Sequence, residues 1–237
     1  MTNTVLKTED LVVGYGGRPV LDGVNIELRC NEVLCLIGHN GAGKSTLLKA
    51  LFGLIPYQGG QVFLDGKPLP LSEPRALSAA GISLMPEGRG IFPGLTVAET
   101  MQMGLWAAGV PKSERSDRLE WVMSALPLMR NFYERRAGTL SGGQQQMVSI
   151  GRALLSQPRC LLMDEPSSGL APKLFQDLLR PIRELHQQTG MSILLVEQNV
   201  KEALKISDRV IVMKSGAIIR EAMPEELSDN VKLMELY

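Results

Sequence analysis

One short segment constrains the fold of this 237-residue chain more than any other. Residues 33–37 (VLCLI) are continuously apolar, which is typical of a strand buried on both faces. A glycine-rich loop follows directly at residues 38–45, and leucines at helical spacing come next, within residues 45–54. A buried strand that leads through such a loop into a helix indicates a parallel sheet covered by helices, so we predict an α/β fold.

The loop has the pattern G-x-x-x-x-G-K-S, whose glycines let the backbone wrap closely around phosphate oxygens. The following helix adds free N–H groups and a partial positive charge of about +0.5. Lys44 is expected to reach the β- and γ-phosphates of a nucleotide, and the Ser45 hydroxyl to hold Mg²⁺. The alternative is a strand-to-helix turn without a ligand. His39 occupies a variable position of the pattern, so we expect no catalytic role for it. The predicted phosphate-binding residues are Gly38, His39, Asn40, Gly41, Ala42, Gly43, Lys44, Ser45 and Thr46.

The chain carries 25 Lys and Arg residues against 25 Asp and Glu residues, so its net charge is zero with both histidines neutral. This balance argues against a generally basic nucleic-acid binder, and we predict no nucleic-acid partner. The three cysteines form no CxxC pair, so neither a zinc site nor a disulfide framework is expected. The N-terminus has no secretory signal, and no apolar run reaches the ~18 residues that span a bilayer. We therefore expect a cytoplasmic chain that meets a membrane only through a partner.

Strand and helix patterns alternate along most of the chain, but the middle differs. Residues 88–139 are rich in Met and Leu, and we interpret them as a helical insertion. From residue 224 onward we expect only a short helix and a tail. Strands are predicted at residues 11–13, 24–28, 33–37, 61–64, 160–163, 192–196 and 210–213, and helices at residues 45–54, 97–108, 117–125, 143–155, 172–188 and 200–206.

Two carboxylates end the apolar strand predicted at residues 160–163. The carboxyl end of a strand in an open α/β sheet lies along the ligand crevice. Asp164 is therefore predicted to accept a Mg²⁺-bound water, and Glu165 to polarise the water that attacks the γ-phosphate. Many strands simply end in charged residues, so this prediction depends on the phosphate-binding loop upstream.

With these motifs in this order, the sequence resembles the ABC ATPase family. Residues 140–144 reproduce the LSGGQ signature of that family, which is rare outside it. The same residues are also typical of a helix start capped by serine, and the two interpretations are compatible. The resemblance implies a head-to-tail dimer with two ATP molecules sandwiched between the subunits. In it, the signature residues Ser141, Gly142, Gly143 and Gln144 would contact the γ-phosphate held by the opposite subunit.

The resemblance covers the chain from Leu11 to about Met223 and implies a fold. That fold is a single ABC ATPase domain over residues 1–237, a P-loop NTPase cassette with a mixed or parallel core sheet. A helical subdomain at about 88–140 would be inserted in the RecA-like core, beside an antiparallel β subdomain. Tyr15 resembles the aromatic residue that stacks on adenine, although an ordinary strand-end tyrosine is the alternative. Residues 168–171 occupy the D-loop, which faces the partner subunit.

Two positions depart from the family pattern. Glu87 stands where the Q-loop usually carries Gln, and Gln198 stands where the switch position usually carries His. The Glu87 carboxylate can still approach Mg²⁺ through an oxygen, at the cost of an added negative charge. The Gln198 amide can donate to the γ-phosphate but cannot relay a proton. Glu165 is therefore the remaining candidate for the base, with Lys44 and Gln198 as the other predicted catalytic residues.

These departures resemble a subgroup, the second ATP-binding subunit of branched-chain amino-acid importers. That resemblance implies ATP and Mg²⁺ as cofactors and a sister ATPase or a second copy as the neighbouring subunit. It also implies two integral-membrane permeases, an indirect periplasmic binding protein, and a location on the inner face of the bacterial plasma membrane. The alternatives are an ATPase for urea or amide import, one for lipid or lipopolysaccharide export, and a soluble non-transport ABC ATPase. The transported substrate cannot be deduced from this chain.

In the family, a permease helix docks beside the Q-loop and the helical insertion. Met and aromatic side chains suit such an adaptable groove. The alternative is that the same residues fill the core of the helical region. The candidates are Arg89, Ile91, Phe92, Met101, Met103 and Trp106.

Overall fold

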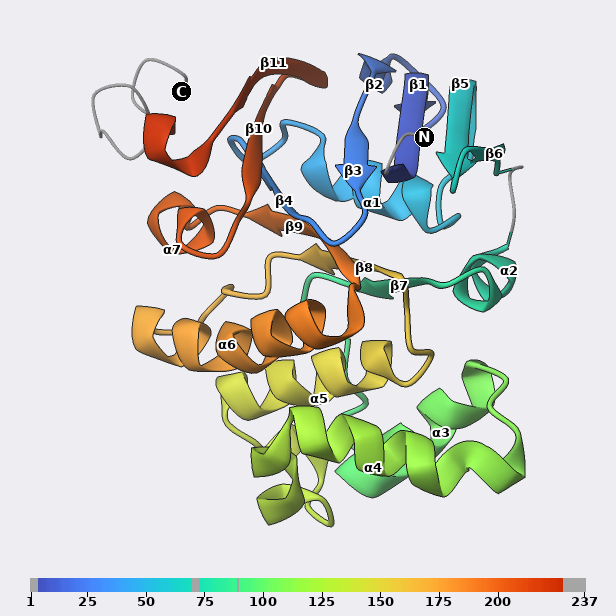
Figure 1. Ribbon diagram of the computed structural model, residues 1–237, viewed down its shortest axis with the longest axis vertical. Coiled ribbons are helices and arrows are strands. Elements are labelled where there is room, and N and C mark those ends of the chain that lie inside the picture. Colours follow the sequence, from blue (N-terminus) through green and yellow to red (C-terminus); the bar gives the residue numbers. More distant parts are fainter. Residues whose placement is uncertain (1–3, 70–72, 89, 228–237) are drawn as a thin grey trace.

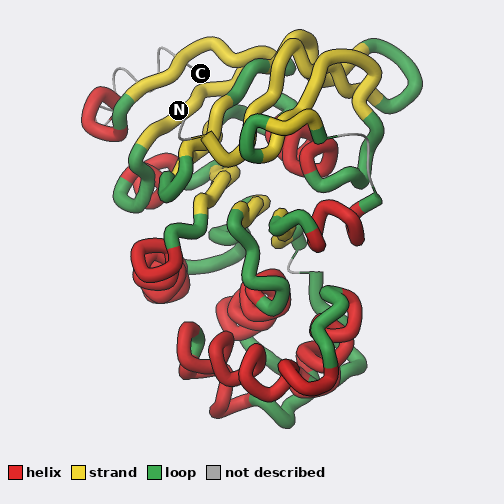
Figure 2. Tube along the Cα trace, turned by 45° about the vertical axis from the view of Figure 1, so that its right-hand side comes forward, coloured by secondary structure: helices red, strands yellow, loops and turns green. Residues whose placement is uncertain are grey.

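The computed structural model of the protein describes residues 4–69, 73–88 and 90–227. Within these residues the chain is layered, with sheets at one end and helices at the other (Figures 1 and 2). None of the described helices is both long and apolar enough to cross a membrane.

The central layer is a six-stranded sheet in the order β11-β10-β4-β9-β8-β7. Five of its strands are parallel, and β11 is antiparallel to β10 at one edge. This confirms the expected mixed or parallel core sheet. The strands are β4 (Val33–Ile37), β7 (Ile82–Met85), β8 (Cys160–Asp164), β9 (Ser192–Glu197), β10 (Arg209–Lys214) and β11 (Ala217–Ala222). Strands β7 and β11 were not predicted from the sequence.

The central sheet separates two hydrophobic cores, because successive side chains of a strand point to opposite faces. In β4, Val33, Cys35 and Ile37 belong to the core on one side. Leu34 and Leu36 belong to the core on the other side. Every residue of β4 is buried, as the continuous apolar run predicted.

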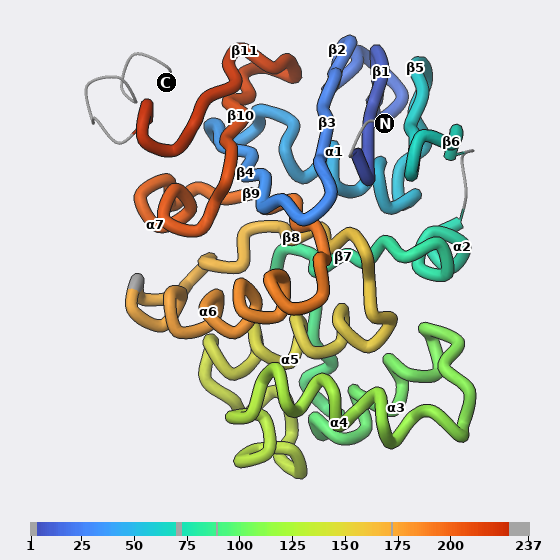
Figure 3. Tube along the Cα trace, viewed as in Figure 1, coloured from blue at the N-terminus to red at the C-terminus, as the bar shows by residue number. Residues whose placement is uncertain are grey.

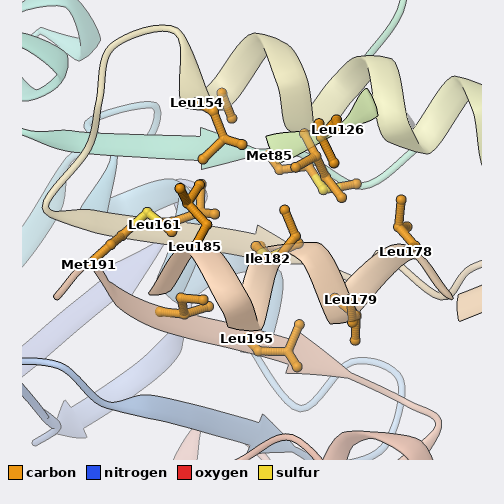
Figure 4. Close-up of a cluster of buried hydrophobic side chains, with 14 of the residues drawn as sticks. Met85, Leu126, Leu154, Leu161, Leu178, Leu179, Ile182, Leu185, Met191 and Leu195 are labelled. Carbon is orange, nitrogen blue, oxygen red and sulfur yellow. The ribbon is translucent and has the colours of Figure 1, made fainter. Parts of the chain in front are cut away.

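Helices α5 (Gly142–Leu154) and α6 (Pro172–Thr189) cover one face of the central sheet (Figure 1). Ile182 and Leu185 of α6 lie in one cluster with Leu161 of β8 and Leu195 of β9 (Figure 4). The α6 helix has apolar residues at the spacing of one helical face, and its polar residues are exposed. Both helices were predicted close to their observed bounds.

The opposite face carries α1 (Lys44–Leu51) and, beyond it, a five-stranded antiparallel sheet in the order β2-β1-β5-β6, with β3 paired to β1. Leu47 and Leu48 of α1 are fully buried in the core between the two sheets. Figure 3 shows the blue N-terminal strands beside α1. The expected antiparallel β region is thus present. Its strands are β1 (Thr4–Gly14), β2 (Pro19–Val24), β3 (Glu27–Arg29), β5 (Tyr57–Leu64) and β6 (Lys67–Pro68).

The prediction of one strand at residues 24–28 is wrong. The chain instead leaves β2 at Val24 and starts β3 at Glu27. Hydrogen bonds from the side chains of Thr8 and Asn25 lie in the gap between these two strands. The Thr8 hydroxyl accepts from the Ile26 N–H, and the Asn25 amide bonds to Asp10. These side-chain hydrogen bonds accompany the break between the two strands.

Helices α3 (Val97–Ala107) and α4 (Arg115–Ala125) form the end of the molecule away from the antiparallel sheet (Figure 1). Thr96 caps α3 by accepting from Glu99 N–H, and the Glu99 side chain bonds back to Thr96. Met101 of α3 is fully buried. Short 3₁₀ turns follow at Lys112–Glu114, Pro127–Phe132 and Ala137–Thr139.

The remaining elements are short. Helix α2 (Pro74–Ala79) was not predicted, and α7 (Val200–Leu204) ends before the predicted residue 206. A 3₁₀ turn at Pro224–Leu227 occupies the start of the predicted C-terminal helix. Residues 228–237 lie outside the described part of the chain.

Candidate functional site

The glycine-rich loop runs from the end of β4 to the start of α1, as predicted, and its shape depends on two glycines. A Cβ atom at Gly38 would lie 2.2 Å from the carbonyl oxygen of Met213 in β10. A Cβ atom at Gly43 would lie 2.6 Å from Leu21 of β2, and the φ of Gly43 is +103°. A side chain at Gly38 would therefore displace the loop from β10, and a side chain at Gly43 would be strained by the positive φ.

Lys44, the first residue of α1, is folded back over the loop that precedes it. Its side chain is only 4% exposed, and Nζ donates to the carbonyl oxygens of Gly38 at 2.8 Å and His39 at 2.9 Å. Burial lowers the pKa of Lys44, and the carboxylates of Glu165 and Asp164 oppose that effect. An ammonium group held at the mouth of the loop is suited to an anionic ligand.

Ser45 and Asp164 meet although 119 positions separate them in the sequence. The Ser45 hydroxyl donates to Asp164 Oδ1 at 2.9 Å. Burial raises the pKa of Asp164 to about 6, with the nearby carboxylates of Glu87 and Glu165 adding to it and the Ser45 hydrogen bond opposing it. This contact joins the start of α1 to the end of β8, as the two motifs together predicted.

These oxygen atoms fit a Mg²⁺ ion. Mg²⁺ prefers hard oxygen donors and is usually held by one or two protein groups together with substrate phosphates and water. Glu87 lies beside the loop and lines the same cavity as Ser45. Within the described residues, no group of three or more His, Cys, Asp or Glu side chains could hold a metal. The hydroxyl of Ser45 and the carboxylates of Asp164 and Glu87 are a small set of oxygen donors, of the kind that can share a metal with phosphate and water.

Glu165 follows β8 in a left-handed conformation, with φ of +49°. Its N–H donates to the carbonyl of Val196 in β9 at 2.9 Å. Its carboxylate accepts from the Gln198 amide, whose Nε2 lies 2.6 Å from each of the two oxygens. From the sequence, Gln198 was expected to donate to a phosphate, and its pairing with Glu165 was not predicted.

A cavity of about 280 Å³ brings most of these residues together. A second hollow of about 420 Å³ shares Asn40 and Gln198 with it and includes Gly38 and His39. The residues that line the first cavity are Val20, Asn40, Gly41, Gly43, Lys44, Ser45, Thr46, Glu87, Glu165 and Gln198.

Besides Gly38 and His39, which line the second hollow, three predicted residues of the loop and its surroundings lie at the margin or outside this cavity. Tyr15 is 63% exposed, and its hydroxyl lies 3.5 Å from Thr46 Oγ1, so the ring stands beside the loop. Ala42 is buried behind the loop and accepts from Gly216 N–H at 2.9 Å. Asp164 is only 1% exposed and reaches the cavity through its contact with Ser45.

The signature residues are not part of this cavity. Ser141 caps α5, with Ser141 Oγ accepting from Gln144 N–H at 3.4 Å and the Gln144 side chain bonding back to Ser141 N–H. Ser141 is exposed, and Gly142, Gly143 and Gln144 are partly exposed. Within one chain, the start of α5 and the phosphate-binding loop are therefore separate surfaces.

Two residues that shape the loop, Val20 and Gly216, were not predicted from the sequence. Val20 of β2 lines the cavity, but nothing in its sequence context marks it. Gly216 lies in the β10–β11 turn with φ of +80°, and a Cβ atom there would lie 2.0 Å from the Val20 carbonyl oxygen. The Ser-Gly pair at residues 215 and 216, directly after the apolar strand β10, was a signal for this tight turn.

The fold and the loop together define a nucleotide-binding ATPase of the P-loop type. A family model described as ABC transporter matches residues 21–168. The chain belongs to this family, as an ATP-binding and ATP-hydrolysing subunit.

Relatives and solved structures agree with this assignment. The chain is 40% identical over 223 residues to the high-affinity branched-chain amino acid transport ATP-binding protein BraG of Pseudomonas aeruginosa, with 94% of each chain covered. It is 37% identical over 232 residues to the probable branched-chain amino acid transport ATP-binding protein LivF of Archaeoglobus fulgidus, with 98% of each chain covered. A crystal structure of a nucleotide-free ATP-binding cassette from an ABC transporter has a TM-score of 0.88 and 32% identity, with 99% of this chain and 98% of the other covered.

Proposed function

We propose that this chain is the ATP-hydrolysing subunit of an importer for branched-chain or other hydrophobic amino acids. The observation that carries the proposal is the similarity to the BraG protein, at 40% identity over 94% of both chains. A similar level of identity to the LivF protein supports it. The substrate would be recognised by other subunits, so this chain would supply the energy for transport.

In this proposal, the phosphate-binding loop holds the triphosphate of ATP and Lys44 reaches its β- and γ-phosphates. The Nζ contacts with the Gly38 and His39 carbonyls support this, because a phosphate at the loop can replace them. Tyr15, exposed beside Thr46, would stack on the adenine. Ser45, Asp164 and Glu87 would hold Mg²⁺, which supplies positive charge beside the phosphates.

Glu165 is the proposed base, because its carboxylate lines the cavity together with Lys44 and follows β8 directly. It would accept a proton from the water that attacks the γ-phosphate. Gln198 would orient that carboxylate through its amide, with the 2.6 Å contacts as support. An amide cannot relay a proton, so Gln198 acts by hydrogen bonding alone.

Residues 141–144 would complete the site of a neighbouring subunit. Their exposure at the capped start of α5, away from the cavity of their own chain, supports this. A helix N-terminus that presents N–H groups to solvent is suited to a phosphate. The assembly would then be a head-to-tail pair, formed with a sister ATPase or with a second copy.

The permeases would dock beside residues 88–140, which we propose form a helical subdomain inserted in the core. Phe92 is 43% exposed and Trp106 is 71% exposed, and both lie in this segment. Met101 is fully buried, so it fills the core of the helical region and does not face a partner. Ile91 and Met103 are half-buried, and Arg89 lies outside the described residues. Through the permeases, the chain would lie on the inner face of the bacterial plasma membrane.

Reconstitution of the complete importer tests this function. The chain is expressed with its sister ATPase, two permeases and the binding protein, and uptake of leucine, isoleucine and valine into ATP-loaded vesicles is measured. We expect ATP-dependent uptake that is lost with Lys44→Ala. Uptake of urea or short amides in place of these amino acids would contradict the assigned substrate class. ATP hydrolysis without any coupled uptake would contradict the transport function.

A further inference from the structure

Glu197 is a buried carboxylate that none of the predicted roles uses. It is the last residue of β9, at the centre of the main sheet, and its side chain is 0% exposed. A buried carboxylate is costly unless hydrogen bonds compensate its lost hydration. The partners of Glu197 therefore indicate what the fold gains by retaining it.

All the partners of this carboxylate come from two loops. Glu197 Oε1 accepts from the Ser167 N–H at 2.8 Å, and Oε2 accepts from the Ser167 hydroxyl at 2.5 Å. Oε2 also accepts from the N–H of Gln198 at 3.1 Å. Burial raises the pKa of Glu197, and the hydrogen bonds from Ser167, Asn199 and Gln198 oppose that effect. No cation pairs with this carboxylate among the described salt bridges, so its compensation comes from these donors.

The two loops are those that carry the paired residues of the site. Ser167 stands two positions after Glu165, and Gln198 follows Glu197 directly. The side chains of Glu165 and Gln198 meet in the cavity at 2.6 Å. Glu197 does not line that cavity itself. From the end of β9, its carboxylate joins the two loops outside the cavity.

We propose that Glu197 is a positioning residue that fixes the loop of Glu165 against the loop of Gln198 and so holds the Glu165 carboxylate in place for ATP hydrolysis. The proposal rests on the proposed role of Glu165 as the base. Ser168 and Gly169, which follow Ser167 directly, line a separate hollow of about 550 Å³ with Gln145 and Gln146 of α5. The same bonds therefore also restrain the segment that leads to this hollow.

The test compares two buried glutamates, each changed to the isosteric amide. Glu197→Gln removes the charge and one acceptor from the Ser167 contacts. Glu32→Gln is the matched control, because Glu32 is also buried, at 5% exposure, and also accepts from a backbone N–H, that of Arg29. Glu32 pairs with Arg209 and does not line the cavity. Both variants are expected to unfold at lower temperature than the wild type.

Only Glu197→Gln is expected to change catalysis. Its kcat should fall about 10- to 100-fold, the loss that a small displacement of a catalytic group produces. Its Kd for ATP should stay within about threefold of the wild type, because a group that acts only in the transition state changes kcat and leaves binding unchanged. Glu32→Gln should keep both constants. A kcat for Glu197→Gln as high as that of Glu32→Gln would overturn the proposal.

Ser167 provides a second and milder test. Ser167→Ala removes the hydroxyl bond and should lower kcat, whereas Ser167→Thr keeps a hydroxyl and should restore most of it. In a Gln198→Ala background, the effect of Glu197→Gln should shrink, because the two residues act on the same carboxylate. If Glu197→Gln does not fold, an unchanged kcat for Ser167→Ala overturns the proposal. A wild-type assembly that hydrolyses no ATP would instead contradict the proposed function.

Discussion

The amide of Gln198 is the polar group nearest to the carboxylate of Glu165, at 2.6 Å from both oxygens. A histidine at this position could exchange a proton with the carboxylate, but an amide cannot. The pairing therefore orients Glu165 without competing for the proton that a base must accept. In the proposed mechanism, proton transfer in this chain would therefore fall to Glu165 alone.

Glu165→Gln is the direct test of that assignment. The amide is nearly isosteric and also tolerates the left-handed backbone, but it cannot accept a proton. We expect steady-state ATP hydrolysis to fall by about 10²- to 10⁴-fold, the contribution of a general base. Binding of ATP, measured by calorimetry, should be retained.

Glu184→Gln is the matched control for this variant. Glu184 is exposed on α6, so the same chemical change should leave hydrolysis and binding at wild-type values. If Glu165→Gln hydrolyses ATP as fast as this control, another group accepts the proton.

Residues inside one motif could be predicted at this scale, and contacts between motifs only in part. The loop pattern alone identified Lys44 and Ser45. The contact of Ser45 with Asp164 followed from two motifs whose strands end at the same edge of a sheet. The bonds of Glu197 to Ser167 carry no local signal, because they depend on how two loops pack after the sheet has formed.

At the scale of elements, the link between β4 and α1 depends on Gly38. Gly38→Ala would place a methyl group 2.2 Å from the Met213 carbonyl oxygen. We expect the free energy of unfolding to fall by about 1–3 kcal/mol, the usual cost of overpacking a well-packed site. ATP affinity should also fall, because the loop must move away from β10.

Urea denaturation and ATP titration of the same protein samples measure both effects. Gly94→Ala is the control, since no atom lies within 4 Å of the added Cβ and its backbone requires no positive φ. Equal stability and equal ATP affinity of the two variants would mean that the loop adapts freely to a side chain.

Helix α6 contributes to stability through its buried face. Ile182 is 1% exposed and lies among Leu161, Leu185 and Leu195 (Figure 4). Ile182→Ala should lower the free energy of unfolding by about 2–5 kcal/mol, because it leaves a cavity in a close-packed core. Arg180→Ala, on the exposed side of the same helix, should change it by less than about 0.5 kcal/mol. Chemical denaturation followed by circular dichroism distinguishes these outcomes, and similar midpoints would contradict the packing described here.

The success of prediction differs between elements for physical reasons. The buried strands β4, β8, β9 and β10 are continuous apolar runs, which stand out in any window. The edge strand β11 alternates exposed and half-buried residues and has no such run. The four-residue strand β7 lies between Gly81 and Pro86, and it is too short to show a period. Helix α6 was predicted through Pro181, because its apolar face continues on both sides of the proline.

At the scale of the whole molecule, a variant at Phe92 can distinguish a surface that docks a permease from the core of the helical region. Phe92 is 43% exposed, and the guanidinium of Arg152 lies 5.8 Å from the centre of its ring. Phe92→Asp should abolish uptake by the reconstituted importer while the purified chain keeps its ATPase activity. A carboxylate on an apolar contact surface leaves a charge that the partner cannot pair.

Ile219→Asp is the control for this change, since Ile219 of β11 is exposed to a similar extent, at 46%, but lies away from this segment. It should leave both uptake and hydrolysis unchanged. Loss of folding or of ATP binding with Phe92→Asp would instead assign Phe92 to the core of the helical region.

Strand β4 has a further consequence for the whole molecule, because it is apolar on both faces. Hydrophobicity alone cannot distinguish its correct alignment from one shifted by a single residue, since leucine, valine and isoleucine would fill either core. Polar and steric contacts at its two ends make the distinction. Val33 N–H donates to the Asp208 carboxylate and Asp208 N–H donates back to Val33, while Gly38 lies against the Met213 carbonyl. A shift by one residue would carry the phosphate-binding loop about 3.3 Å along the sheet. The contacts at the two ends of β4 thus fix its alignment, and this alignment sets the position at which the nucleotide can bind.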